Sequence, residues 1–172
     1  MDHMVCAVGA PAAAMQLDCR DLGYQLTALP PDYAFLVIHS GSDRKLSEGL
    51  YNQRVAECAA AAAEIGVDSL RDATLSDLGL SGDTVAARRA RHVISENDRV
   101  VAAGMALADR DMAGFGRLMN DSHASLAADY EVSSDRLDRL VTAARAAGAL
   151  GARLTGAGFG GCVVVLVEAV HA

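Results

Sequence analysis

The sequence predicts an α+β fold, with a mainly antiparallel sheet covered on one face by about four helices. Strand-like patterns occur at the two ends of the chain, and helix-like patterns fill its middle. The length of 172 residues suits one domain, so residues 1–172 are expected to form a single unit. A hydrophobic content of 52% and a charged content of 22% exclude a disordered tail.

The N-terminal part contains three strand patterns. Residues 14–19 and 24–29 flank the turn 20–23, whose sequence is Arg-Asp-Leu-Gly. A pair of prolines then interrupts the pattern before the apolar stretch 35–39. Three short strands so close together favour antiparallel pairing.

Helical periodicity begins near residue 46. Apolar residues recur every three or four positions in four segments. The expected helices cover, in order, residues 46–65, 83–107, 115–126 and 137–144. Gly66 ends the first helix, the segment Ser133-Ser134-Asp135 caps the last, and Gly148 closes it.

A glycine-rich bend precedes the last strand. Residues 151–161 read Gly-Ala-Arg-Leu-Thr-Gly-Ala-Gly-Phe-Gly-Gly and hold five of the 16 glycines. The spacing of Gly156, Gly158 and Gly161 matches a dinucleotide-binding fingerprint, but that motif needs a helix after its glycines. Residues 162–167 have no helical period, so we reject that interpretation. We expect the bend to feed a buried strand and to present N–H groups to an anion, with a purely structural turn as the alternative.

Composition narrows the choice of partners. The formal net charge of −7 argues against nucleic acid, because phosphate-backbone binding requires a basic face. No apolar run is long enough to cross a membrane and no export leader is evident, so we expect a cytoplasmic protein with small-molecule or protein partners. The four cysteines form no Cys-x-x-Cys pair and are expected to be buried, reduced thiols rather than metal ligands.

Two histidines and two carboxylates have ordinary explanations. His92 and His123 fall among apolar neighbours on helices, where a hydrogen-bonded core histidine is more common than a ligand or a base. Asp129 and Glu131 flank a tyrosine just before a helix cap, so we interpret them as capping and ion-pairing residues.

A series of short motifs runs along the whole chain. In order, they are Met1-Asp2, Leu17-Asp18-Cys19-Arg20, Tyr51-Asn52-x-Arg54, Arg89-Ala90-Arg91-His92-Val93, Phe115-Gly116-Arg117-Leu118-Met119, Ser122-His123-x-Ser125-Leu126, Asp129-Tyr130-Glu131-Val132-Ser133 and the glycine bend. In this order and spacing, the chain resembles the C-terminal half of the galactokinases, which are members of the GHMP sugar kinase superfamily. The resemblance implies the fold of a GHMP kinase C-terminal domain. It also implies phosphorylation of the C1 hydroxyl of galactose, with ATP and Mg²⁺ as the cofactors and with galactose and ATP as the partners.

The resemblance implies roles for individual residues. Asp2 matches the family's catalytic base, and Tyr51 matches its sugar-contacting tyrosine. By residue type alone, Asp2 is a solvated terminal residue and Tyr51 a packing residue. A carboxylate suits the role of base because it is ionised at neutral pH and only accepts hydrogen bonds.

The glycine bend matches the family motif that borders the sugar and the γ-phosphate. Gly158 is therefore expected beside the sugar, and Gly156, Gly160 and Gly161 beside the phosphate, where a side chain would obstruct close approach. Arg44 is expected near the nucleotide phosphates, because a guanidinium pairs with them in a forked geometry.

The same resemblance implies a second half outside these 172 residues. In the family, the phosphate loop and the magnesium ligands belong to the N-terminal ATP-binding domain, so no metal ligand is expected in this chain. We expect that domain to be supplied in cis or in trans, and the chain alone to be inactive. Two alternatives stay open: a kinase for N-acetylgalactosamine or a related sugar, and a non-catalytic sugar sensor.

Overall fold

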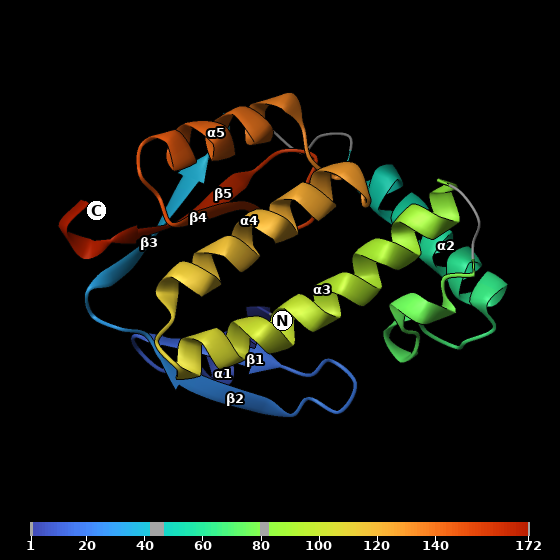
Figure 1. Ribbon diagram of the computed structural model, residues 1–172, viewed down its shortest axis with the longest axis horizontal. Coiled ribbons are helices and arrows are strands. Elements are labelled where there is room, and N and C mark those ends of the chain that lie inside the picture. Colours follow the sequence, from blue (N-terminus) through green and yellow to red (C-terminus); the bar gives the residue numbers. More distant parts are fainter. Residues whose placement is uncertain (1, 42–46, 80–82, 172) are drawn as a thin grey trace.

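The structure, a computed structural model, describes residues 2–41, 47–79 and 83–171 (Figure 1). The α-helices in these ranges are α1 (Asp2–Val8), α2 (Ser47–Ile65), α3 (Val85–Ala108), α4 (Met112–Ala128) and α5 (Asp135–Ala146). The strands are β1 (Ala13–Leu17), β2 (Tyr24–Ala28), β3 (Tyr33–His39), β4 (Gly151–Thr155) and β5 (Cys162–Glu168). Short 3₁₀ helices occupy Leu70–Asp72, Leu75–Asp77 and Ala169–His171. None of the helices in this part of the chain is long and apolar enough to cross a membrane.

The α+β class is confirmed, and the described strands divide between two antiparallel sheets instead of forming one. β1 and β2 form a hairpin, in which Ala13 is opposite Ala28 and Leu17 is opposite Tyr24. The second sheet has the order β3-β5-β4, so β3 pairs with a strand from the far end of the chain. Two prolines separate β2 from β3, and a residue without an N–H group does not continue a ladder.

The central strand β5 is packed on both faces of its sheet. Val163 and Val165 belong to a buried cluster with Leu137 and Val141 of α5. Leu166 faces the other way, into a cluster that includes residues of α3 and α4. In Figure 1, β4 and β5 accordingly lie between α5 and α4. A continuous Val/Leu run is the pattern expected of such a doubly buried strand.

α4 lies along the outer edge of β4 and supplies the hydrogen-bond partners that an edge strand lacks. Asn120 Nδ2 donates to the Leu150 carbonyl oxygen at 3.2 Å, and its Oδ1 accepts from the Ala152 N–H at 3.1 Å. His123 Nδ1 accepts from the Leu154 N–H at 3.3 Å. Polar side chains of one helix thus satisfy backbone groups that the sheet leaves unpaired.

Two glycines set the distance between α4 and β4. A Cβ atom on Gly116 would lie 2.5 Å from the Leu150 carbonyl oxygen, and one on Gly151 would collide with the backbone of Gly116. Neither position therefore accepts a larger residue unless the helix moves away from the strand.

The expected helix ends agree with the structure. Ser134 caps α5, because its Oγ accepts from the Leu137 N–H at 3.5 Å. Gly66 and Gly148 follow α2 and α5 with φ values of 85° and 98°, the left-handed conformation that commonly ends a helix.

α1 was not expected from the sequence. None of its described side chains is buried, and Cys6 on this helix is exposed. Cys19 in the hairpin turn is also exposed, whereas Cys58 and Cys162 are partly buried. The expectation of buried cysteines is therefore wrong for Cys6 and Cys19, since apolar neighbours in sequence do not bury a residue on a surface helix or turn.

Candidate functional site

The glycine-rich bend forms a turn between Thr155 and Cys162 that joins β4 to β5. Positive φ values occur at Gly156, Gly158, Phe159, Gly160 and Gly161. Among these five residues, Phe159 is the one that is not glycine, and its φ is 59°. This backbone conformation is uncommon and energetically costly for a residue other than glycine. The backbone path of the turn, rather than side-chain packing, explains the glycines.

Backbone contacts from two distant segments hold the turn. The Phe159 N–H donates to the Val132 carbonyl oxygen at 2.7 Å. The Ser40 N–H donates to the Gly161 carbonyl oxygen at 2.8 Å. A Cβ atom on Gly158 would overlap the Val132 carbonyl oxygen, so this glycine is required by close approach as well as by its φ.

The turn also carries free hydrogen-bond donors. The N–H groups of Ala157, Gly158 and Gly160 donate to no acceptor among the residues that the structure describes. Successive N–H groups in such turns form concave binding sites for anions. Of these three residues, Ala157 is exposed, whereas Gly158 and Gly160 are buried.

The first half of α2 lies beside this turn. Tyr51 on α2 is 54% exposed, and Arg54, one helical turn later, is buried at 8% exposure. The guanidinium carbon of Arg54 lies 5.9 Å from the centre of the Phe159 ring. Because residues three apart share a helix face, Arg54 places the Tyr51 face of α2 next to the glycine turn.

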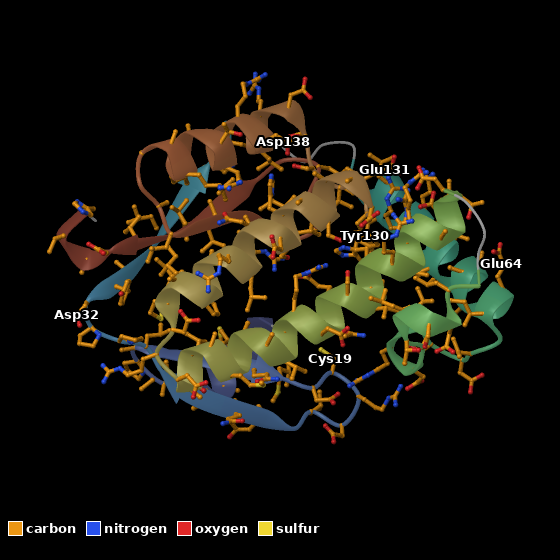
Figure 2. The ribbon with its side chains drawn as sticks, in the orientation of Figure 1. Cys19, Asp32, Glu64, Tyr130, Glu131 and Asp138 are labelled. Carbon is orange, nitrogen blue, oxygen red and sulfur yellow. The ribbon has the colours of Figure 1, made fainter. Side chains whose placement is uncertain are left out.

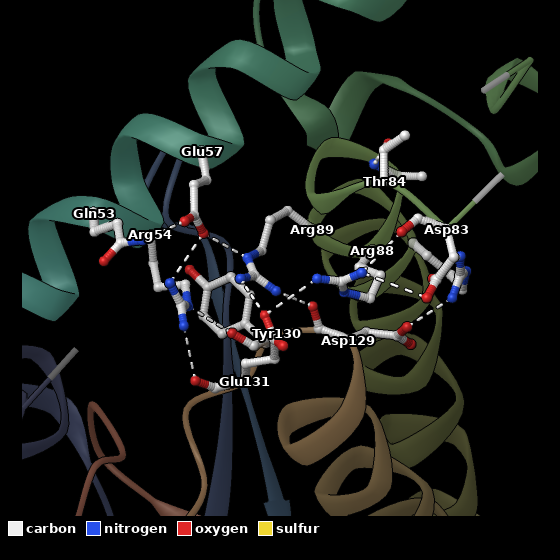
Figure 3. A network of polar contacts seen from close by, with 12 residues as sticks. Gln53, Arg54, Glu57, Asp83, Thr84, Arg88, Arg89, Asp129, Tyr130 and Glu131 are labelled. Atoms are coloured by element: carbon white, nitrogen blue, oxygen red, sulfur yellow. Dashed lines mark hydrogen bonds and ion pairs between the residues drawn. The ribbon is translucent and has the colours of Figure 1, made fainter. Parts of the chain in front are cut away.

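A network of charged groups surrounds the segment that follows α4 (Figure 3). Arg54 donates through Nε to the Tyr130 carbonyl oxygen at 2.7 Å and through Nη2 to the Glu131 carbonyl oxygen at 2.9 Å. Arg89, at 2% exposure, donates to the carboxylates of Glu57 (2.6 Å) and Glu131 (2.5 Å). Figure 2 shows Tyr130 and Glu131 where α2, α3 and the end of α4 meet.

The members of this network are charged. Burial works to raise the pKa of Glu57, but hydrogen bonds from Arg89 and Gln53 outweigh it and lower that pKa. The hydrogen bond from Arg89 is the main cause that lowers the pKa of Glu131. Burial works to lower the pKa of Arg89, yet its two carboxylate partners raise it. The network therefore consists of ion pairs at neutral pH.

Tyr130 is enclosed between α2 and α3. Its ring stacks on His92 with 4.4 Å between ring centres, and Cys58 Sγ lies 3.9 Å from its hydroxyl. Burial is the main cause that raises the pKa of Tyr130 to about 12, and Tyr51 acts in the same direction. His92 Nδ1 lies 2.9 Å from Ser125 Oγ, which confirms His92 as a hydrogen-bonded core histidine.

His123 is confirmed as a hydrogen-bonded core histidine, and Asp129 and Glu131 as ion-pairing residues, whereas the cap of α5 is Ser134. His123 is buried, with Nδ1 on the β4 backbone and Nε2 at 3.2 Å from Asp138. Burial lowers the pKa of His123, which suits a ring whose Nδ1 must accept a hydrogen bond. Asp129 pairs with Arg91 at 2.8 Å, and Glu131 pairs with Arg89 as described above.

The structure brings some of the expected site residues together. Tyr51 and the glycine turn belong to segments that meet through Arg54 and the Phe159 ring. Asp2 begins α1, and its side chain is outside the described part of the chain. In Figure 1, α1 lies with β1 and β2, away from the turn between β4 and β5. Arg44 also lies outside the described residues, so the roles of both residues stay predictions.

Sequence reasoning gave no role to Arg54 or Arg89. A partial signal was present, because Arg54 is three residues from Tyr51 and three from Glu57, and residues three apart are neighbours on a helix surface. The backbone partners of Arg54 are distant in sequence, since Arg54 and Tyr130 are 76 positions apart. Such contacts depend on tertiary packing and leave no spacing pattern in the sequence.

Comparisons with known proteins identify the family of the chain. Residues 105–172 match the family described as GHMP kinases C terminal. The chain is 46% identical over 177 residues to the galactokinase of Roseiflexus sp. (strain RS-1), which covers 98% of this chain and 45% of that protein. It is 42% identical over 178 residues to the galactokinase of Mycobacterium bovis (strain BCG / Pasteur 1173P2), which covers 100% of this chain and 49% of that protein. The chain spans slightly less than half the length of these relatives.

Solved structures show the same likeness. Lactococcus lactis galactokinase, crystallised in complex with galactose, superposes with a TM-score of 0.81 at 38% identity, over 91% of this chain and 43% of that one. The L. major mevalonate kinase in complex with R-mevalonate shares the fold, with a TM-score of 0.52 at 20% identity, over 90% of this chain and 40% of that one.

Proposed function

Because the chain belongs to the galactokinase family, as its C-terminal region, we propose that it forms one side of the active site of an ATP-dependent galactose kinase. The product is galactose 1-phosphate, formed by transfer of the γ-phosphate of ATP to the C1 hydroxyl of the sugar. The observation that carries the proposal is the identity of 42–46% with galactokinases along nearly the whole chain. The ATP-binding N-terminal domain of the family completes the site in cis or in trans.

Tyr51 and the glycine turn provide the sugar side of the site. Tyr51 is 54% exposed, so its ring is free to cover an apolar face of a pyranose while its hydroxyl makes a hydrogen bond. Gly158 is proposed to contact the sugar through its backbone, since the Val132 carbonyl oxygen occupies the place where a side chain would lie. We place the γ-phosphate beside the amides around Gly160 and beside Arg44.

Asp2 is the proposed catalytic base. Its carboxylate accepts the proton of the C1 hydroxyl as the sugar oxygen forms a bond to the γ-phosphorus and the bond from that phosphorus to ADP breaks. ATP supplies the phosphoryl group. In this proposal, the Mg²⁺ ligands belong to the N-terminal domain of the family.

A chimera tests the proposal. The chain replaces the matching region of the Roseiflexus sp. galactokinase, and ATP-dependent phosphorylation of galactose is measured against that enzyme. We expect the chimera to phosphorylate galactose and the 172-residue chain alone to show no turnover. A folded chimera without turnover, or with a preference for N-acetylgalactosamine, would contradict the assignment.

Single substitutions test the residue roles in the same chimera. Tyr51→Phe should raise the KM for galactose several-fold while the KM for ATP stays constant, because only the sugar loses a hydrogen bond. Tyr24→Phe is the matched control, since Tyr24 is 48% exposed but lies on the β1–β2 hairpin. Asp2→Asn should abolish turnover and leave the melting temperature unchanged. Equal effects of the two tyrosine substitutions would exclude Tyr51 from the sugar site.

A further inference from the structure

We propose that Arg54 is a positioning residue that holds the glycine turn at a fixed place relative to Tyr51. This inference rests on the proposed function, because it concerns the same sugar site. Arg54 has no contact with a substrate in this proposal. It acts through the segment after α4 and through the Phe159 ring.

The guanidinium of Arg54 contacts two backbone carbonyl oxygens, one carboxylate and one aromatic ring. Nε and Nη2 donate to the carbonyl oxygens of Tyr130 (2.7 Å) and Glu131 (2.9 Å), while Nη1 donates to Glu57 at 3.0 Å (Figure 3). Its guanidinium carbon lies over the Phe159 ring, 5.9 Å from the ring centre, within the range of a cation–π contact. At 8% exposure, the group is shielded from water, which strengthens each of these contacts.

The two segments that Arg54 contacts both contain a strained residue. Glu131 has a φ of 54° and Phe159 a φ of 59°, and a residue with a side chain rarely adopts this conformation. Such residues persist only where surrounding contacts hold them. The Phe159 N–H donates to the carbonyl oxygen of Val132, so the strained positions are also hydrogen-bonded through adjacent backbone. Arg54 binds the carbonyl oxygen of one strained residue and the ring of the other.

The same side chain is anchored on the helix that carries Tyr51. Tyr51 and Arg54 are three residues apart on α2, so the contacts of Arg54 link the helix that carries Tyr51 to the segment that holds Gly158. Lysine cannot substitute, because its ammonium lacks both the planar fork for two carbonyl oxygens and the flat face for a ring. The contact therefore demands arginine and not merely positive charge.

Amide hydrogen exchange of the 172-residue chain tests the positioning role without any activity. Arg54→Lys should accelerate exchange of the Phe159 amide about tenfold, while the amide of Val165 in the central strand exchanges at its original rate. Arg99→Lys is the matched control, since Arg99 is also largely buried and pairs with a glutamate three residues away, Glu96, at 2.7 Å. Equal exchange rates at Phe159 in the two variants would overturn the proposal.

The kinetics of the chimera provide a second test of the positioning role of Arg54. Arg54→Lys should raise the KM for galactose about tenfold, with a smaller change in kcat and with the KM for ATP unchanged. A purely structural role would lower the amount of folded enzyme, which lowers kcat and leaves the KM for galactose constant. That result would overturn the proposal.

A milder variant covers the case in which Arg54→Lys does not fold. Phe159→Leu removes the ring under the guanidinium and leaves Arg54 bound to its two carbonyl oxygens. It should raise the exchange rate of the amide at position 159 and the KM for galactose, and the absence of both effects would overturn the proposal. An unsubstituted chimera that fails to phosphorylate galactose contradicts the proposed function instead, and the exchange experiment then decides the positioning role by itself.

Discussion

The stability of the chain should fall between pH 7.5 and pH 5, and His92 should account for much of the loss. Burial is the main cause that lowers the pKa of His92 from 6.5 to about 4. Glu96 and Asp129 act to raise this pKa, and Arg99 and Arg153 act to lower it. The ring is 5% exposed and stacked on a tyrosine, so the folded chain favours the neutral form.

The direction and size of the stability change follow from the difference in the pKa of His92 between the folded and the unfolded chain. A depressed folded-state pKa gives stability that is fully present above the unfolded value of 6.5 and is lost as the pH falls toward about 4. At pH 5 the unfolded chain binds a proton at His92 and the folded chain largely does not. The expected loss from this residue between pH 7.5 and pH 5 is about 2 kcal/mol. His123, whose pKa is also lowered, adds a loss in the same direction.

Urea unfolding followed by circular dichroism at the two pH values measures this effect. His92→Phe keeps a ring to stack on Tyr130 but cannot bind a proton, although it loses the contact with Ser125. The variant should be less stable at pH 7.5, and its further loss at pH 5 should be smaller than that of the unsubstituted chain by about 2 kcal/mol. Equal losses for the two proteins would refute the reasoning about His92.

Three further substitutions test the packing that supports the site. Gly116→Ala should lower the free energy of unfolding by about 1–3 kcal/mol, since its Cβ would press on the Leu150 carbonyl; an unchanged urea midpoint would refute this. Asn120→Ala should cost about 1–3 kcal/mol, because it leaves the Ala152 N–H without its partner; unaltered amide protection at that residue would contradict this. Gly158→Ala should reduce both thermal stability and chimera turnover, and a variant with unaltered melting temperature and kcat would show that the turn has room for a side chain.

Much of the local structure was predictable from the sequence. The helices around α2 to α5 follow from apolar periodicity, and the terminal glycines at Gly66 and Gly148 mark where two of them end. The division into two sheets was not predictable. Pairing of β3 with β5 depends on contacts between opposite ends of the chain, for which a single sequence carries no local signal. α1 was missed because its residues show no buried face.

The candidate site was predictable in part. The glycine cluster indicated a tight turn, and the resemblance indicated Tyr51. The link between them was not visible, because it runs through Arg54 and backbone carbonyl groups of residues that are distant in sequence. The sequence alone does not show whether an arginine is buried against carbonyl oxygens or lies on the surface. Only the folded arrangement distinguishes the two cases.

A crystal structure of the chimera with bound galactose would test the central claim most directly. We expect the sugar to contact the Tyr51 side chain and the backbone of Gly158, with the Asp2 carboxylate within hydrogen-bond distance of the C1 hydroxyl. A sugar bound away from the glycine turn, or an Asp2 side chain remote from the C1 hydroxyl, would contradict the assignment of this chain as one side of a galactose kinase site.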